Sequence, residues 1–296
     1  MHAFSNSINI MFKRRSIWLS FGFVMLGIGI INYYNPIYTF IFGFDGLDIS
    51  GLLNSIVSFL NLFTSFFDSP MAIIKTILIV AGVLLAVSFI CAIFFSGTFN
   101  VINKTMEGRQ KAPGDFSEGL KRYYSKTVFV LFRVLFFGVI FLLFLMVVSV
   151  PAIVITKAWI SGKAGLMVSA LILDFLTAVV LFFLVIFFTT YILFWFPASV
   201  NSDKKSFTFG KHVVDTMFWK IAGRVILIIL VFIVYQGLML AADRVLIGTN
   251  PDATFASIIL FVVNWFLNTM FSSFLATYVF YIFKYITANK RNRIEA

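Results

Sequence analysis

The chain is built from long apolar runs that are almost free of charged residues. A membrane-spanning helix needs about 20 mostly apolar residues, whereas a strand of a membrane barrel needs about 10 residues of alternating character. The runs here are continuous, so they predict helices that cross a bilayer. Charged residues make up only 12% of the 296 residues, against about 25% in soluble domains. That shortage excludes a soluble fold, because too few charges are available to cover a surface that faces water.

The runs predict an all-α integral membrane bundle, a single polytopic domain over residues 1–296 with six transmembrane helices that pair as three hairpins. A motif of the form F-x-x-T-Y-x-x-aromatic occurs at residues 187–194 and again at 274–281, near the ends of the fourth and sixth spans. Such repetition is common in transporters, although scaffolds, channels and chance similarity among Phe-rich spans also produce it. The predicted spans are residues 17–33, 73–95, 128–155, 166–196, 221–242 and 255–283.

Lysine and arginine are distributed unequally between the two sides of the predicted bundle. All but four of the 23 Lys and Arg residues fall on the side that carries both termini, and the four on the other side are Lys75, Lys157, Lys163 and Arg244. Cytoplasmic loops of membrane proteins are enriched in Lys and Arg. We therefore expect a plasma-membrane protein with both termini in the cytoplasm.

Residues 49–67 form a seventh apolar stretch with a different character. Their polar residues recur at helical spacing, as a stripe of Asn54, Ser55, Ser58, Asn61 and Ser65. A further span here would also place the basic loop 104–133 outside, against the charge rule. The stretch is therefore interpreted as an amphipathic helix on the outer face, lying in the interface or capping the bundle. A re-entrant hairpin that uses Gly43, Gly46, Gly51 and Pro70 is the alternative.

Two amphipathic segments on the cytoplasmic side, residues 115–126 and 206–219, predict helices in the inner interface. Asp115 is expected to be the N-cap of the first helix, since Glu118 follows at capping-box spacing. Basic side chains on such helices attract anionic headgroups by about 1 kcal/mol each, and the alternative is that they only anchor the topology. The candidate headgroup contacts are Lys121, Arg122, Lys126, Lys211 and Lys220.

The first of these segments belongs to a longer pattern, G-x-x-x-x-P-x-x-F-x-E-G, formed by Gly108, Pro113, Phe116, Glu118 and Gly119. With the spans on either side, about residues 90–220, it resembles a broad bacterial set of multi-pass proteins related to the membrane domain of glycerophosphodiester phosphodiesterases. The resemblance implies a six-span-like helical fold in the plasma membrane. It implies no catalytic residues, because in that set the phosphodiesterase activity belongs to a separate soluble domain that this sequence lacks.

Motifs that would indicate a familiar enzyme are missing from the sequence. His2 and His212 are the only histidines and Cys91 is the only cysteine, so clustered metal ligands and cystine frameworks are not expected. Neither a phosphate-binding P-loop nor a G-x-S-x-G nucleophile motif occurs. Asp115 and Glu118 would suit a general acid and base, but helix capping explains them better. We expect no cofactor, no metal and no nucleic-acid partner.

A few polar residues lie inside the predicted spans, where an ionisable side chain costs about 2.5 to 3.5 kcal/mol on insertion scales. Asn264, Asn268 and Ser272 follow one helix face at i, i+4, i+8 spacing. With Asp174 and Gln236 they are candidates for a polar lining, shared by spans four to six, for a small solute or a proton. The alternative for Asp174 is a structural contact, with Arg244 or Lys163 as partner.

Three functions are compatible with these features. The first is a non-enzymatic plasma-membrane protein that acts as an accessory, scaffold or transport-related component, with the bilayer, anionic inner-leaflet lipids and a possible membrane protein as partners. The second is a secondary transporter or channel that uses the polar lining. The third, a lipid-modifying enzyme, has the least support because the sequence shows no catalytic constellation.

Overall fold

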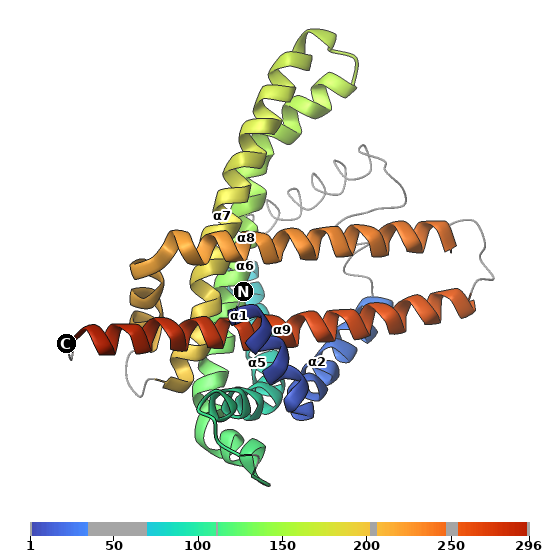
Figure 1. Ribbon diagram of the computed structural model, residues 1–296. Helices are drawn as coiled ribbons and strands as arrows, with labels where there is room; N and C mark the ends of the chain where they lie inside the picture. The colour runs from blue at the N-terminus through green and yellow to red at the C-terminus, as the bar shows by residue number, and fades with distance from the viewer. Residues whose placement is uncertain (1, 35–69, 111, 202–205, 247–253, 295–296) are drawn as a thin grey trace. The chain divides into compact units, whose positions relative to one another are not determined.

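The computed structural model describes residues 2–34, 70–110, 112–201, 206–246 and 254–294 (Figure 1). This part of the chain contains helices and no strands, so the predicted all-α class is confirmed for it. The predicted outer-face helix 49–67 lies outside the described residues. The helices are α1 His2–Lys13, α2 Arg15–Tyr34, α5 Pro70–Met106, α6 Asp115–Ile160, α7 Met167–Asn201, α8 Ser206–Leu246 and α9 Thr254–Ile294, with a short 3₁₀ helix, Ala164–Leu166, before α7.

Five of these helices, α5 to α9, are long and apolar enough to cross a membrane. Apart from Leu166, which ends the 3₁₀ helix, they contain the second to the sixth predicted spans, so the chain has the character of a multi-span membrane protein. The first predicted span, 17–33, forms α2, but its apolar part Arg15–Ile30 is shorter than the five. The full count of six spans and their pairing as three hairpins remain predictions.

The helix α6 is longer than its predicted span, because the segment 115–126 is continuous with it. No proline or glycine interrupts residues 120–137, so nothing breaks the backbone hydrogen bonding between the amphipathic segment and the span. The 46 residues of α6 reach about 69 Å at 1.5 Å per residue, more than twice the hydrocarbon thickness of about 30 Å. The predicted separate helix 115–126 is therefore the first part of one long helix.

The second amphipathic segment is set off from its span by a kink. Within α8, Met217 has the non-helical backbone angles φ −140° and ψ 30°, and Figure 1 shows the first part of α8 turned sharply away from its long remainder. The kink lies within the predicted helix 206–219, close to its end. The two amphipathic segments thus join their spans differently.

The helix α1 has no counterpart among the predicted elements. It packs on α9, where Asn6 Nδ2 donates to Tyr281 Oη at 3.0 Å and the Phe4 and Phe274 rings have centroids 4.9 Å apart. Its apolar residues Phe4, Ile8, Met11 and Phe12 recur at helical spacing between Ser and Asn residues. That periodicity is a signal from which α1 is predictable.

The chain divides into two compact units. The first contains residues 1–29, 89–131 and 186–296, and the second contains residues 30–88 and 132–185. The core of the first unit has two main clusters. One is centred on Phe194, Val214 and Phe283 of α7, α8 and α9, and the other on Ile17, Ile102 and Phe280 of α2, α5 and α9. The core of this unit therefore forms toward the ends of α5, α7 and α9 and the beginnings of α2 and α8.

The repeated F-x-x-T-Y motif has the same local structure in both copies. Thr190 of α7 and Thr277 of α9 are fully buried, and each donates its hydroxyl proton to the backbone carbonyl four residues earlier, at 2.6 and 2.8 Å. A buried threonine that satisfies its own hydroxyl in this way permits close helix packing in an apolar setting. Both copies contribute to the core of the first unit.

Away from these clusters, the spans expose their apolar side chains. In the most apolar window of each of the five long helices, only 6% to 11% of the residues are buried. A surface of this kind is unfavourable in water and favourable in hydrocarbon. The five helices therefore indicate a membrane-embedded protein.

Candidate functional site

A cluster of charged side chains joins the start of α6 to neighbouring helices. The Asp115 side chain is only 9% exposed, with Lys104 Nζ 3.1 Å from its Oδ1 and Arg14 Nη1 3.7 Å from its Oδ2. Lys104 also pairs with Glu118, one turn further along α6. We call Arg14, Lys104, Asp115 and Glu118 the Asp115 cluster. Two cations beside one buried carboxylate offset the cost of removing it from water, so the cluster ties α5 and the α1–α2 junction to α6.

The expected N-cap role of Asp115 is wrong, because Asp115 is the first residue of α6 and Gly114 precedes it with a φ of +98°. The backbone N–H of Glu118 donates to the Gly114 carbonyl at 2.8 Å. Asp115 Oδ2 instead accepts the backbone N–H of Ala112 at 3.2 Å. The Asp115 carboxylate faces away from the first turn of α6, toward Lys104 and Arg14. Interactions with these charged groups are stronger than a bond to a neutral backbone N–H of the first turn would be.

Four residues of the G-x-x-x-x-P-x-x-F-x-E-G pattern have a place in the junction between α5 and α6, while Pro113 is exposed. Gly108 turns the chain after α5 with a φ of +73°, and Glu118 binds Lys104. A Cβ on Gly97 of α5 would lie 2.5 Å from the Phe116 ring, and one on Gly119 would lie 2.8 Å from the Ser96 carbonyl oxygen. The pattern therefore encodes a close crossing of two helices.

A second group of charges ties α9 to the end of α5. Lys284 Nζ donates to the Asn103 carbonyl at 3.0 Å and lies 3.3 Å from Glu107 Oε1. Glu107 also pairs with Arg109 at 3.0 Å, and Arg14 donates to the Arg109 carbonyl at 3.1 Å. Sequence reasoning did not find these pairs. The sequence did offer one signal. Acidic residues are few on the basic side of the predicted bundle, so an acidic residue there is expected to pair with one of the many cations.

Three of the five candidate lining residues meet in the seam between α8 and α9. Gln236 Nε2 donates to Asn268 Oδ1 at 3.1 Å, and Asn268 Nδ2 donates to Asn264 Oδ1 at 2.8 Å. Tyr235 Oη donates to the same Asn264 oxygen, a contact that the sequence did not predict. We call Tyr235, Gln236, Asn264 and Asn268 the seam network. All four are partly buried, so they satisfy one another between two apolar helices.

Asp174 belongs to the other unit. Thr156 Oγ1 of α6 lies 3.0 and 2.8 Å from the two carboxylate oxygens of Asp174 on α7, and Asp174 is half-buried. The partner that the structure shows for Asp174 is therefore a threonine. The structure does not describe the Arg244 side chain. A lining that combines Asp174 with the seam network remains a prediction.

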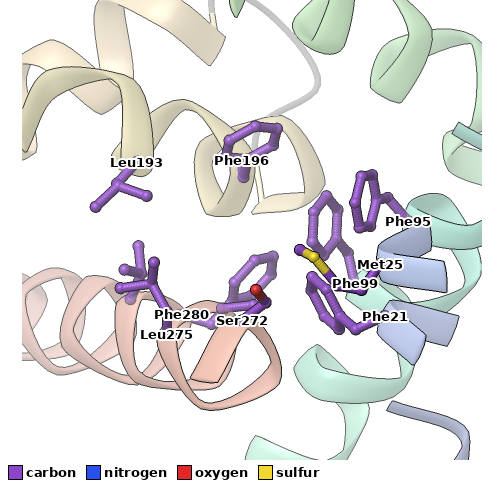
Figure 2. A pocket seen from close by; sticks show the side chains of 11 residues that line it. Phe21, Met25, Phe95, Phe99, Leu193, Phe196, Ser272, Leu275 and Phe280 are labelled. Atoms are coloured by element: carbon purple, nitrogen blue, oxygen red, sulfur yellow. The ribbon is translucent and has the colours of Figure 1, made fainter. Parts of the chain in front are cut away.

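Ser272, the fifth candidate, lies apart from the seam network in a cavity of about 190 Å³ in the first unit. Figure 2 shows its hydroxyl and the Met25 thioether directed into this space. Among the described residues that line it, Ser272 is the only one with a polar side chain, and the others come from α2, α5, α7 and α9: Phe21, Met25, Phe95, Phe99, Leu193, Phe196, Leu275, Ala276, Val279 and Phe280. We call this space the phenylalanine cavity.

The candidate headgroup contacts lie largely at the surface. Lys121, Arg122, Lys211 and Lys220 are exposed and Lys126 is half-buried. The Arg122 guanidinium carbon is 5.3 Å and Lys126 Nζ is 6.0 Å from the centroid of the Tyr123 ring. An aromatic face beneath two cations stabilises both of them, which keeps positive charge next to the core of the first unit.

In the described part of the chain, no three His, Cys, Asp or Glu side chains come together in a way that would hold a metal ion. The comparisons with known proteins add no relative: no family model, no curated protein and no solved structure matches the chain.

Proposed function

We propose that the protein is a non-enzymatic, multi-pass component of the plasma membrane, with both termini in the cytoplasm, that serves a membrane system as an accessory or scaffold. One observation carries the proposal: the polar side chains of the Asp115 cluster and of the seam network bind one another, while the apolar faces of the spans stay exposed. The Asp115 cluster and the seam network both use their polar groups for contacts between helices. Such groups fix a framework whose outer surface is apolar.

The exposed face of α8 illustrates what that framework offers. Leu230, Val234 and Leu238 lie four residues apart and are 50%, 61% and 67% exposed. Lipid tails are as apolar as leucine, so association between membrane helices depends on close packing rather than on the hydrophobic effect. An apolar stripe of this kind suits packing against lipid or against the helix of a partner membrane protein.

The resemblance to membrane domains related to glycerophosphodiester phosphodiesterases is part of this proposal. Two of the residues that carry it lie where α6 crosses α5: Gly119 lies against Ser96 and Gly97, and Glu118 binds Lys104. A pattern that specifies a helix crossing suits a shared membrane framework.

A secondary transporter or channel is the second candidate, and the seam network favours it. Polar side chains within a span face a neighbouring helix or a water-filled path, and Asn268 has hydrogen bonds on both sides. A network of this kind is able to pass a proton or a small solute when its hydrogen bonds rearrange.

Two measurements on the intact chain separate the candidates. The first is cross-linking in native membranes followed by purification, and we expect a membrane protein partner at fixed stoichiometry. The second is flux of protons, and of a panel of labelled small solutes, into proteoliposomes, and we expect none above empty vesicles. Flux that Asn268→Leu abolishes, while the exposed control Val262→Leu on the same helix retains it, would contradict the accessory role and establish the transporter.

A further inference from the structure

The phenylalanine cavity lies near the charged ends of α5 and α9. On α9, Phe280 is four residues from Lys284, and on α5, Phe99 is five residues from Lys104. At a rise of 1.5 Å per residue these separations are about 6 and 8 Å along the axes. If the basic side faces the cytoplasm, the cavity lies at the depth where acyl chains of the inner leaflet begin.

The cavity is shaped for an apolar chain. Its lining on α9 runs from Ser272 to Phe280, which spans about 12 Å along the helix axis. Acyl chains run in the same general direction as membrane helices. Apolar cavities of about 150 Å³ stay dry and take up apolar molecules such as benzene, so a space of about 190 Å³ lined by five phenylalanines favours hydrocarbon over water.

Positive charge lies beside the same core. Tyr123 is 6% exposed and packs in the cluster that contains Phe21, Phe99 and Phe280 of the cavity wall. Arg122 and Lys126 lie over the Tyr123 ring, and Arg122 is exposed. Cations at the depth of the headgroups attract anionic lipids over zwitterionic ones.

We propose that the phenylalanine cavity binds one acyl chain of an anionic phospholipid from the inner leaflet. The chain lies along α9 between Ser272 and Phe280, and the phosphate remains near Arg122, the exposed cation beside Tyr123. This assignment goes beyond the accessory role and does not depend on it, because a scaffold and a transporter are each able to hold a structural lipid.

The test uses the full chain in vesicles of phosphatidylethanolamine and phosphatidylglycerol. A trace of phosphatidylglycerol carries a photoactivatable diazirine in one acyl chain, and mass spectrometry locates the labelled residues after irradiation. We expect labelling concentrated on the cavity-lining segments of α5 and α9. Labelling that is no denser there than on the exposed face of α8 would overturn the site, and this result needs no variant.

A matched pair of variants tests the same site by filling it. Ser272→Phe places a ring in the cavity, and we expect labelling of the lining segments to fall about tenfold, since the added volume competes with the chain. Val262→Phe adds a ring at an exposed position of the same helix, and we expect no change. Equal labelling in both variants would contradict the proposal.

Two further probes identify the source of the chain. The same diazirine chain on phosphatidylcholine tests the headgroup, and the free diazirine fatty acid tests the need for a phospholipid. We expect phosphatidylglycerol to label the cavity most strongly. Labelling by phosphatidylcholine or by the fatty acid that equals it would overturn the assignment to an anionic phospholipid.

Discussion

Asp115 is the residue where sequence and structure differ most usefully. Its spacing from Glu118 predicts an N-cap, yet the carboxylate lies between Lys104 and Arg14. A capping box depends only on local sequence, whereas this cluster also includes Arg14, about a hundred positions before Asp115. Long-range charge pairing of this kind is not readable from spacing, although the scarcity of acids on the basic side hints at it.

Substituting Asp115→Asn tests the cluster. The change leaves Lys104 and Arg14, which are 14% and 6% exposed, next to a neutral amide, and removing one partner of a buried pair costs about 3 kcal/mol or more. We expect a clear fall in the Tm of the protein in detergent. Asp243→Asn, at an exposed acid of α8, is the control, and an equal effect of both changes would show that Asp115 is not a stabilising partner.

Glycine substitutions on α6 test the close helix crossing. A Cβ on Gly119 would lie 2.5 Å from Asn100 Cβ and 2.8 Å from a backbone oxygen, while Gly138 on the same helix has nothing within 4 Å. We expect Gly119→Ala to destabilise by about 1 to 3 kcal/mol through overpacking. Gly138→Ala should be neutral or stabilising by up to about 1 kcal/mol. Thermal unfolding measures both, and a tolerated Gly119→Ala would refute the crossing.

Among the elements, the long apolar spans are predicted from the sequence and their continuations are not. Apart from Leu166, the second to sixth predicted spans lie within α5 to α9, because composition alone selects apolar helices. The hydrophobic pattern does not show whether an amphipathic segment continues its span, as in α6, or bends from it, as at Met217 of α8. That choice depends on packing at the helix ends. The helix α1 is also absent from the predicted elements, because it is amphipathic and too short to resemble a span.

The candidate polar residues divide in a similar way. Gln236, Asn264 and Asn268 are found together because helical spacing and depth place them on facing helices. Ser272 continues the same stripe but lies in the phenylalanine cavity, and Asp174 pairs with Thr156. Spacing predicts which residues share a helix face. It does not predict which neighbouring helix covers each part of that face.

A double-mutant cycle measures the seam between α8 and α9. Gln236→Leu and Asn268→Leu each remove the hydrogen bond that joins the two side chains, so their effects on stability should not add. Interhelical hydrogen bonds in membrane proteins contribute about 0.6 kcal/mol on average and up to about 1.7, and we expect a coupling in this range from thermal unfolding. Strictly additive effects would mean that the bond does not contribute.

At the scale of the whole molecule, the account depends on which side of the bilayer holds the basic residues. The helices show apolar surfaces suited to hydrocarbon, and the unequal distribution of cations predicts their direction. The proposed lipid site, the headgroup contacts and the cytoplasmic position of the Asp115 cluster all depend on that direction. A topology in the opposite sense would move each of them to the outer surface.

Cysteine accessibility in intact cells measures this direction most directly. In a Cys91→Ser background, Lys121→Cys on α6 and Lys163→Cys in the turn before α7 each place one thiol at an exposed position. With a membrane-impermeant maleimide, we predict labelling of Lys163→Cys in intact cells and of Lys121→Cys only after the membrane is permeabilised. Labelling of Lys121→Cys in intact cells, with Lys163→Cys protected, would contradict the account.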